Sequence, residues 1–277
     1  MTNTDLIYRL NLEEPHELIE SGNWNWSTFK EELTKGTIKD GDTSYVGLYV
    51  NSVGFLPITA AYSNGGAYIK KSGNIYSSGL TDSEMTAAIE YCSSLFSSGI
   101  AAEKVVGDFS GGTAPYYYGP SWEGTITSET ATDLPVYTMD SFGMVSFPYG
   151  PNGNKDTVSA TVDGNSSLLY TSLMTNYDSD EMGSILSLLF DPLPDSADEG
   201  WKELANYLFH FDQDSETFIN NVENVNYLYD VTLSETYKDD MMFKELKEVI
   251  LGNKTATEVI SSVNAILIEE INSTLNK

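Results

Sequence analysis

The sequence is poor in the residues that build disulfides and histidine metal sites. Among its 277 residues there is one cysteine, Cys92, and there are two histidines, His16 and His210. A single thiol cannot form a disulfide within the chain, and two imidazoles cannot supply a histidine-rich metal site. No run approaches the roughly 18 apolar residues of a membrane-spanning helix. The first residues form neither a basic nor an apolar stretch, so we expect no signal peptide in this sequence.

Basic residues are also scarce. The chain has 14 lysines and arginines, of which only Arg9 is an arginine, against 41 aspartates and glutamates, and its formal net charge is −27. Such a surface repels phosphate backbones and anionic membranes, because binding to them gains affinity from lysine and arginine. We therefore exclude nucleic acid as a partner and expect no membrane span. Since 40% of the residues are apolar and 12% are aromatic, the chain has enough material for a folded core.

No motif of a common catalytic or cofactor site is present. The chain contains no GxGxxG, Walker, HExxH or CxxC pattern. The segment 119–124 misses the GxSxG spacing of a nucleophile elbow by one residue. Acid pairs alone do not indicate a glycosidase, because 41 acidic residues always supply some pair. We predict a non-catalytic protein without a cofactor.

Two clusters of acidic residues invite comparison with calcium-binding loops. In the segment 178–189 the first, third and sixth positions fit an EF-hand loop, but Met182 and Leu189 stand where oxygen ligands are needed. In the segment 212–217 acids alternate in the same way, but Thr217 replaces the required glycine. Acidic residues at helix N-termini explain both clusters, so we predict no metal site.

The chain is predicted to mix helices and strands throughout, which indicates an α/β protein. The clearest helix spans 82–98, with Thr81 and Glu84 as a capping box and Gly99 as the residue that ends it. Cys92 falls on its apolar face, where we expect a core residue rather than a reactive thiol. Three short helices are predicted within 5–36: Pro15 begins the second, Asn25 or Ser27 caps the third, and Gly36 ends it. Further helices are predicted at 180–190, 199–211, 215–224, 241–251 and 256–275. Thr255 and Glu258 are expected to cap the last of them. Strands are predicted at 45–50, 55–61, 113–119, 142–148, 157–162 and 168–173, with a hairpin at 68–76.

Aromatic side chains gather in sequence beside glycine-rich loops. They are Tyr116, Tyr117, Tyr118, Trp122 and Phe142. Aromatic rings stack on the C–H faces of sugars, and an acidic, arginine-poor protein suits a neutral ligand. Aromatic residues in short strands are, however, usually core residues. Composition alone leaves both interpretations open.

Several short motifs follow one another in a recognisable order. The first lies in DLIYRLNLEEPHELIESGNWNW (residues 5–26), which reads as a short helix, a proline and then Gly-x-Trp-Asn-Trp-x-x-Phe ending at Phe29. A strand at 45–49 comes next. It is followed by an aromatic residue, a glycine pair with a hairpin, and the helix at 81–98.

Two further motifs complete this order. The segment 109–122 reads as a Phe-x-x-Gly-x-Ala strand followed by a loop with glycine and tryptophan. The segment 142–151 reads as a strand exit of the form Gly-x-x-x-x-Pro-x-Gly-Pro. Together the motifs cover residues 1 to about 155 and resemble the later part of bacterial extracellular solute-binding proteins, the sugar-binding subunits of ABC importers.

The resemblance implies a fold and a set of ligand contacts. The fold is the type II periplasmic-binding-protein-like α/β fold, in which two lobes close on a solute and aromatic residues stack on it. Matched position by position, the resemblance implies ligand contacts from Phe55, Gly65, Gly66, Tyr118 and Trp122.

The resemblance also implies a division of the chain. Residues 1–155 would form an α/β ligand lobe, 156–198 a segment that returns to the other lobe, and 199–277 a C-terminal helical region. Members of this family carry roughly a hundred or more residues ahead of the matched part, enough for most of one lobe. We therefore expect an incomplete clamshell in this sequence.

Two interpretations of function follow. In the first, the chain is a non-catalytic solute-binding module derived from an ABC importer subunit, extracellular or at the cell surface, and binds a neutral solute such as an oligosaccharide. In the second, it is a repurposed structural or interaction protein, for example a virion or surface assembly component, which binds no sugar. In the second interpretation a protein partner covers the place of the missing lobe.

Overall fold

The computed structural model describes residues 1–121, 123, 142–157, 159–162, 184, 200–209, 211–227, 241–274 and 276. Its central feature is a five-stranded sheet with the order β7-β4-β8-β1-β9. The strands are β1 (Thr2–Asn3), β4 (Leu48–Val50), β7 (Ala101–Glu103), β8 (Tyr116–Tyr118) and β9 (Phe142–Gly143). β4 pairs in parallel with β7 and with β8, while β1 pairs antiparallel with β8 and β9.

Alternation along the strands sends side chains to two cores. Leu48, Val50 and Tyr116 belong to the larger buried cluster, whereas Tyr49 and Tyr117 belong to a smaller one. This division follows from the strand geometry, because successive side chains point to opposite faces of a sheet. The strands are therefore covered on both faces, as expected of an α/β protein.

Up to residue 121, where the described part of the chain is continuous, six helices accompany the sheet. They are α1 (Thr4–Arg9), α2 (Pro15–Glu20), α3 (Trp26–Gly36), α4 (Leu56–Ser63), α5 (Ser83–Ser97) and α6 (Val106–Ser110). Asn25 caps α3 as predicted, because its side chain accepts hydrogen bonds from Ser27 N and Thr28 N at 3.0 and 3.2 Å. Gly99 follows α5 with φ of +72°, as expected of a glycine that ends a helix. Cys92 of α5 is fully buried, and burial raises the pKa of its thiol.

The strand predicted at 55–61 is wrong: residues 56–61 lie in helix α4, and Phe55 is the residue that precedes its first turn. Nearly every residue of α4 is buried, so its sequence shows no polar face that would mark a helical period. The capping box of Thr81 and Glu84 is also wrong. The residue that caps α5 is Asp82, and it makes no side-chain cap hydrogen bond.

Strand lengths differ from the prediction as well. Of the segment 113–119 only Tyr116–Tyr118 form β8, and of 142–148 only Phe142–Gly143 form β9. Of the described residues in 157–162, only Thr161–Val162 form a strand, β10, which pairs in parallel with β11 (Asn226–Tyr227). The strand at 168–173 lies outside the described residues, as does the helix at 180–190 apart from residue 184.

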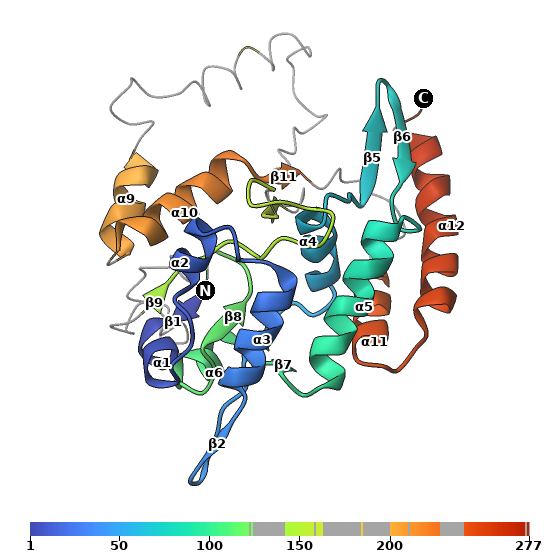
Figure 1. The fold of residues 1–277 in the computed structure, drawn as a ribbon. Coiled ribbons are helices and arrows are strands. Elements are labelled where there is room, and N and C mark those ends of the chain that lie inside the picture. Colours follow the sequence, from blue (N-terminus) through green and yellow to red (C-terminus); the bar gives the residue numbers. More distant parts are fainter. Residues whose placement is uncertain are drawn as a thin grey trace.

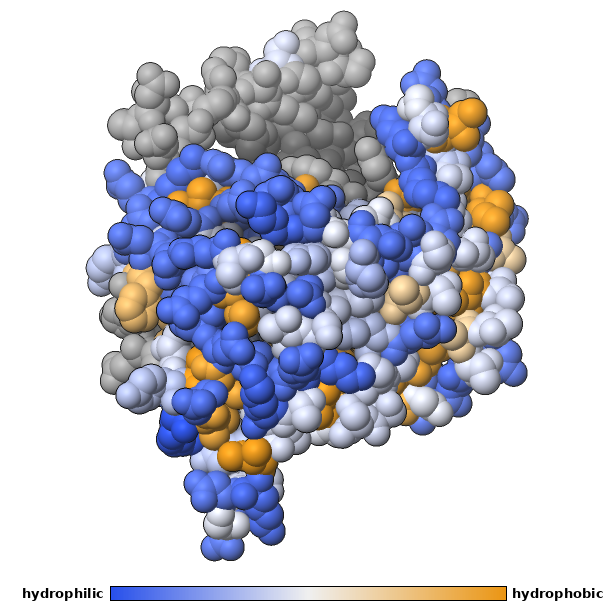
Figure 2. Space-filling model, in the orientation of Figure 1, coloured by the Kyte–Doolittle hydropathy of each residue, from blue (hydrophilic) through white to orange (hydrophobic). Residues whose placement is uncertain are grey.

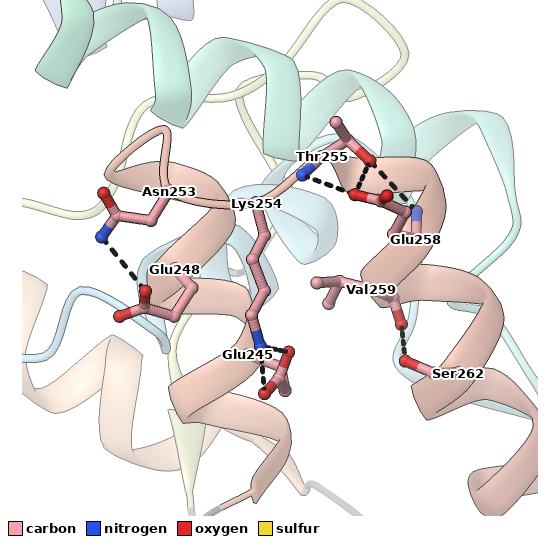
Figure 3. Close-up of polar contacts among 8 residues, drawn as sticks. All are labelled: Glu245, Glu248, Asn253, Lys254, Thr255, Glu258, Val259 and Ser262. Carbon is pink, nitrogen blue, oxygen red and sulfur yellow. Dashed lines mark hydrogen bonds and ion pairs between the residues drawn. The ribbon is translucent and has the colours of Figure 1, made fainter.

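Helices dominate the C-terminal part, as predicted. α9 (Gly200–Leu208) and α10 (Asp212–Glu223) lie together on the side of α2, and α11 (Met241–Ile250) and α12 (Ala256–Thr274) lie beside α5 (Figure 1). The loop before α12 contains the predicted capping box (Figure 3): Thr255 N donates to Glu258 Oε2 and Glu258 N donates to Thr255 Oγ1, both at 3.4 Å. The same view shows Lys254 reaching back to Glu245 of α11.

Two hairpins extend from this body. β2 (Lys39–Asp40) and β3 (Thr43–Ser44) form one that projects away from the sheet (Figure 1). β5 (Ile69–Ser72) and β6 (Ile75–Ser78) form the predicted hairpin, and β6 runs beside α12. The Asn276 side chain pairs with both the N–H and the C=O of Tyr76, so it occupies hydrogen-bonding positions on the outer edge of β6.

The surface agrees with the acidic composition. On the face drawn in Figure 2, hydrophilic residues cover most of the described surface and hydrophobic ones form small, separate patches. Among the described residues no helix combines the length and apolar character needed to cross a membrane.

Candidate functional site

A cavity of about 530 Å³ opens where β4 and β8 end; we call it the aromatic cavity. Its walls come from β8 and the following turn, from the first turn of α4, from the segment 144–148 and from the end of α10. Ligands of open α/β sheets commonly bind in the crevice beyond the carboxyl ends of the strands. The volume also falls within the range that is usual for small-molecule sites, about 300–1,000 Å³.

Two of the predicted ligand residues, Phe55 and Tyr118, line this cavity together. Phe55 stacks on Phe243 of α11 with ring centroids 3.9 Å apart. The Tyr118 hydroxyl lies 2.6 Å from Thr59 Oγ1, and the Tyr118 ring meets Phe147 edge to face at 6.0 Å. Burial is the main influence that raises the pKa of Tyr118. The hydroxyl therefore stays neutral, and both rings are held in place by α4 and α11.

The predicted glycine pair lies elsewhere. Gly65 and Gly66 come directly after α4, beside Asn152 and Glu84 respectively, and neither is among the described residues that line the aromatic cavity. Trp122 lies outside the described residues. The structure therefore brings together Phe55 and Tyr118 but does not bring the glycine pair to them.

Several cavity residues have no role in the sequence prediction. Trp24 and Phe147 line the cavity from the motif segments, and Phe218 and Asn221 line it from α10. Trp24 Nε1 donates a 2.8 Å hydrogen bond to Ser146 O, which fixes the indole beside the segment after β9. Trp24 belongs to the tryptophan pattern on which the resemblance rests, so that pattern could have identified it as a site residue. No local sequence signal connects α10 with strands that lie about 100 positions earlier.

A buried carboxyl group lies behind one wall of the aromatic cavity. Glu123 is 5% exposed, and it accepts 2.6 Å hydrogen bonds from Tyr117 Oη and from Asn51 Nδ2. Burial raises the pKa of Glu123, and the two hydrogen bonds oppose that rise only in part. Glu123 does not itself line the cavity among the described residues.

A second cavity, of about 500 Å³, lies on the other side of the segment 144–148; we call it the polar cavity. It shares Trp24, Ser146, Phe147 and Asn221 with the aromatic cavity. The remaining lining is largely polar or charged and comes from α2, from the turn 154–157 and from α10.

One residue that lines the polar cavity, His16, pairs with the buried Asp214, which is not itself among the lining residues. His16 Nε2 lies 3.0 Å from Asp214 Oδ1, and Met144 N donates to the same oxygen at 2.7 Å. Asp214 belongs to the acidic segment 212–217, which forms the first turn of α10 in agreement with the interpretation as helix N-terminal acids. Its carboxylate has two partners within the protein. Among the described residues no group of three or more histidine, cysteine or acidic side chains is placed to hold a metal ion.

Comparison with known proteins bears on the fold. No protein-family model and no curated protein matches the chain. Solved structures do match. The GacH receptor of Streptomyces glaucescens GLA.O shares 13% identity and a TM-score of 0.63, covering 98% of this chain and 68% of its own. A sugar transporter of Arthrobacter chlorophenolicus A6 with bound laminaribiose shares 15% identity and a TM-score of 0.60, covering 100% and 69%. UgpB of Mycobacterium tuberculosis, in complex with glycerophosphocholine, shares 13% identity and a TM-score of 0.57, covering 98% and 67%.

These similarities show the fold. The chain has the type II periplasmic-binding-protein-like α/β fold, and the resemblance found in the sequence motifs is confirmed at that level. The chain spans slightly more than two thirds of the length of the neighbours named above.

Proposed function

We propose that this chain is a non-catalytic solute-binding module that takes a neutral carbohydrate in the aromatic cavity. The observation that carries the proposal is the composition of that cavity. Its described lining residues offer aromatic rings, hydroxyls and amide groups but no charged side chain. Rings that stack on C–H faces, with a few neutral hydrogen-bonding groups between them, are what a sugar requires. The proteins of the same fold include receptors and transporters of sugars by their own descriptions.

The ligand contacts follow from this placement. We assign stacking roles to Phe55 and Tyr118, both of which have one side packed against other aromatic rings. Trp122 remains a predicted stacking residue on the resemblance alone. Gly65 and Gly66 remain predicted ligand neighbours on the same ground, although neither lines the cavity. Export, docking to an ABC importer and a location outside the cell belong to the same proposal.

Calorimetric titration tests the proposal. The probes are laminaribiose and maltotriose, with inorganic phosphate as a charged control ligand. We expect saturable heat with at least one sugar and none with phosphate. Loss of one stacked ring in Tyr118→Ala or Phe55→Ala should weaken binding about three- to tenfold, and Trp122→Ala should do the same.

A matched control is available at a position that lines neither cavity. Tyr8 of α1 is 89% exposed and does not line either cavity, so Tyr8→Ala removes an aromatic ring without touching the site. The proposal fails if neither sugar gives saturable heat. It also fails if Tyr8→Ala weakens binding as much as Tyr118→Ala.

One observation favours the alternative, an interaction protein. Tyr207 of α9 and Phe211, the residue before α10, are large hydrophobic residues four positions apart in the sequence, and they are 84% and 56% exposed. In this alternative a polypeptide equivalent to the remaining third of the neighbours covers these two residues. Sedimentation of the chain alone, combined with binding of a dye that reports exposed apolar surface, tests this alternative, because a stable monomer without dye-binding apolar surface contradicts an obligate assembly role.

A further inference from the structure

The buried carboxyl group of Glu123 joins the ends of two neighbouring strands. Asn51 directly follows β4 and Tyr117 lies within β8, and Glu123 accepts a 2.6 Å hydrogen bond from each side chain. The backbone adds a third connection, because Asn51 N donates to Tyr118 O at 2.9 Å. One acidic side chain therefore connects β4 and β8 beside the crevice at their ends.

The turn that follows β8 packs directly onto this carboxyl group. Glu123 N donates to Pro120 O at 3.1 Å, which closes the turn. At Gly119 a side chain would not fit, since a Cβ there would lie 2.5 Å from the Tyr117 ring and 2.6 Å from Glu123 Oε2. Gly119, Pro120 and Ser121 all line the aromatic cavity, whereas Glu123 does not. Any effect of Glu123 on a ligand must therefore pass through this turn or through its hydrogen-bond partner Tyr117, which also lines the cavity.

A carboxyl group is a costly choice for this position. Burying an ionisable group requires that its oxygens find hydrogen-bond donors within the protein. Here both oxygens have donors, and the donors come from the two strands whose ends form the site. A fully satisfied polar network of this kind fixes one arrangement of the groups around it. An apolar side chain of similar size would fill the space without fixing the turn.

We propose that Glu123 is a positioning residue for the ligand site: it holds the turn 119–121 and the end of β8 in the arrangement that forms one wall of the aromatic cavity. The consequence for sugar binding rests on the proposed function. The positioning itself does not, because the turn and the strand ends can be observed without a ligand.

Three variants test this inference. Glu123→Ala removes both acceptors. Glu123→Gln keeps the shape, and its amide can accept from Asn51 Nδ2 and donate to Tyr117 Oη. Asn51→Ala removes one of the two connections and serves if Glu123→Ala does not fold. Glu32→Ala is the matched control. Glu32 is also a buried glutamate, and it accepts hydrogen bonds from the backbone N–H of Glu13 and from the side chain of Lys35. It lies in α3, however, and lines neither cavity.

The first measurement is hydrogen exchange of the backbone amide of residue 51, whose acceptor is Tyr118 O. We expect exchange of this amide to be about tenfold faster in Glu123→Ala, to rise by less in Asn51→Ala, and to change by no more than about twofold in Glu123→Gln. Glu32→Ala should leave this amide unchanged even if the whole protein becomes less stable. Unchanged exchange in Glu123→Ala, or an equal increase in Glu32→Ala, overturns the inference.

The second measurement is the affinity for laminaribiose by calorimetry. Glu123→Ala should bind at least about tenfold more weakly, since a displaced wall loses the contacts of several groups, while Glu123→Gln should bind within about twofold of the parent protein. A Glu123→Ala protein with altered exchange but unchanged affinity overturns the role in binding. If the parent protein binds no sugar, the proposed function fails and the exchange measurement still decides whether Glu123 positions the turn.

Discussion

The contact between His16 and Asp214 gives the sharpest test of how α10 is held against the rest of the molecule. Asp214 is 2% exposed and takes hydrogen bonds at 3.0 Å from His16 Nε2 and at 2.7 Å from Met144 N. One carboxyl group thus joins α2, α10 and the segment after β9. Because α10 lines both cavities, weakening this contact should loosen the region in which we place the ligand.

The direction of the pH dependence follows from the pKa of His16. Burial, the largest influence, lowers that pKa, but the hydrogen bond and charge of Asp214, together with the charges of Glu14 and Glu20, outweigh burial and raise it above 6.5. A raised pKa in the folded state means that the folded protein holds the proton more tightly than the unfolded chain does. The stabilisation is therefore complete below about pH 6.5 and is lost as the pH rises through the folded-state pKa.

The magnitude depends on how the pair is broken. The side chains of His16 and Asp214 are 12% and 3% exposed, so solvent screens the pair only weakly. Asp214→Ala removes the partner of His16 and the acceptor of Met144 N, and we expect a loss of about 3 kcal/mol in the free energy of unfolding. Asp214→Asn keeps an acceptor and removes only the charge, so about 1–2 kcal/mol is expected.

Two assays check this prediction. Histidine NMR is simple because the chain has only two histidines, and His16→Gln identifies their signals. Urea unfolding at about pH 5.5 and about pH 8 then gives the stability of the parent protein and of His16→Gln on both sides of the ordinary histidine pKa. The parent should lose more stability than His16→Gln between these values. A measured His16 pKa at or below 6.5, or equal losses in the two proteins, refutes the reasoning.

Three further predictions concern the core and the helix ends. Cys92 is fully buried and its thiol pKa is raised by burial, so a thiol reagent such as DTNB should not react until urea unfolds the protein; fast reaction of the native protein contradicts the burial. Gly54→Ala should lower the free energy of unfolding in urea by about 1–3 kcal/mol, because a Cβ at Gly54 would lie 2.1 Å from Phe243 O. An unchanged unfolding midpoint contradicts the close approach of α11 to Gly54. Thr255→Ala should cost about 1 kcal/mol by losing the cap of α12, and Thr255→Ser should restore most of it.

The sequence predicts the fold best where local signals agree with each other. The helices at 83–97, 241–250 and 256–274 carry an apolar stripe and an end signal, and each lies within two residues of its predicted bounds. The prediction failed at α4, where the apolar residues of a fully buried helix look the same as those of a buried strand. Strands of two or three residues, such as β9, are set by pairing with β1 rather than by their own sequence, so their lengths could not be read locally.

The site is less predictable than the fold, because it is assembled from distant segments. Phe55 and Tyr118 were identified through a family pattern, and the structure places both on the aromatic cavity. The contribution of α10 had no signal, since it depends on contacts such as His16 with Asp214, which are 198 positions apart. Glu123 was visible only as one acid among 41. Its two hydrogen-bond donors exist only when β4 and β8 lie side by side.

The distribution of charge between the two cavities bears on the kind of ligand. Charged residues make up 20% of the chain, and the polar cavity includes Glu20, Lys155, Asp156 and Glu216. The described lining of the aromatic cavity has no charged side chain although the two cavities share a wall. In a chain with a net charge of −27, an anionic ligand would need basic groups to offset the surrounding field, and no lysine, arginine or histidine side chain lines this cavity in the described part of the chain. Met1 lines the cavity, but burial lowers the pKa of its amino group to about 5, so that group is largely uncharged at neutral pH. A cationic ligand would need a carboxylate there; Glu123, which lies against the turn that lines the cavity, has both oxygens engaged. A neutral ligand requires neither basic groups nor a carboxylate. The acidic composition that excludes nucleic acid therefore also supports a neutral solute in the aromatic cavity.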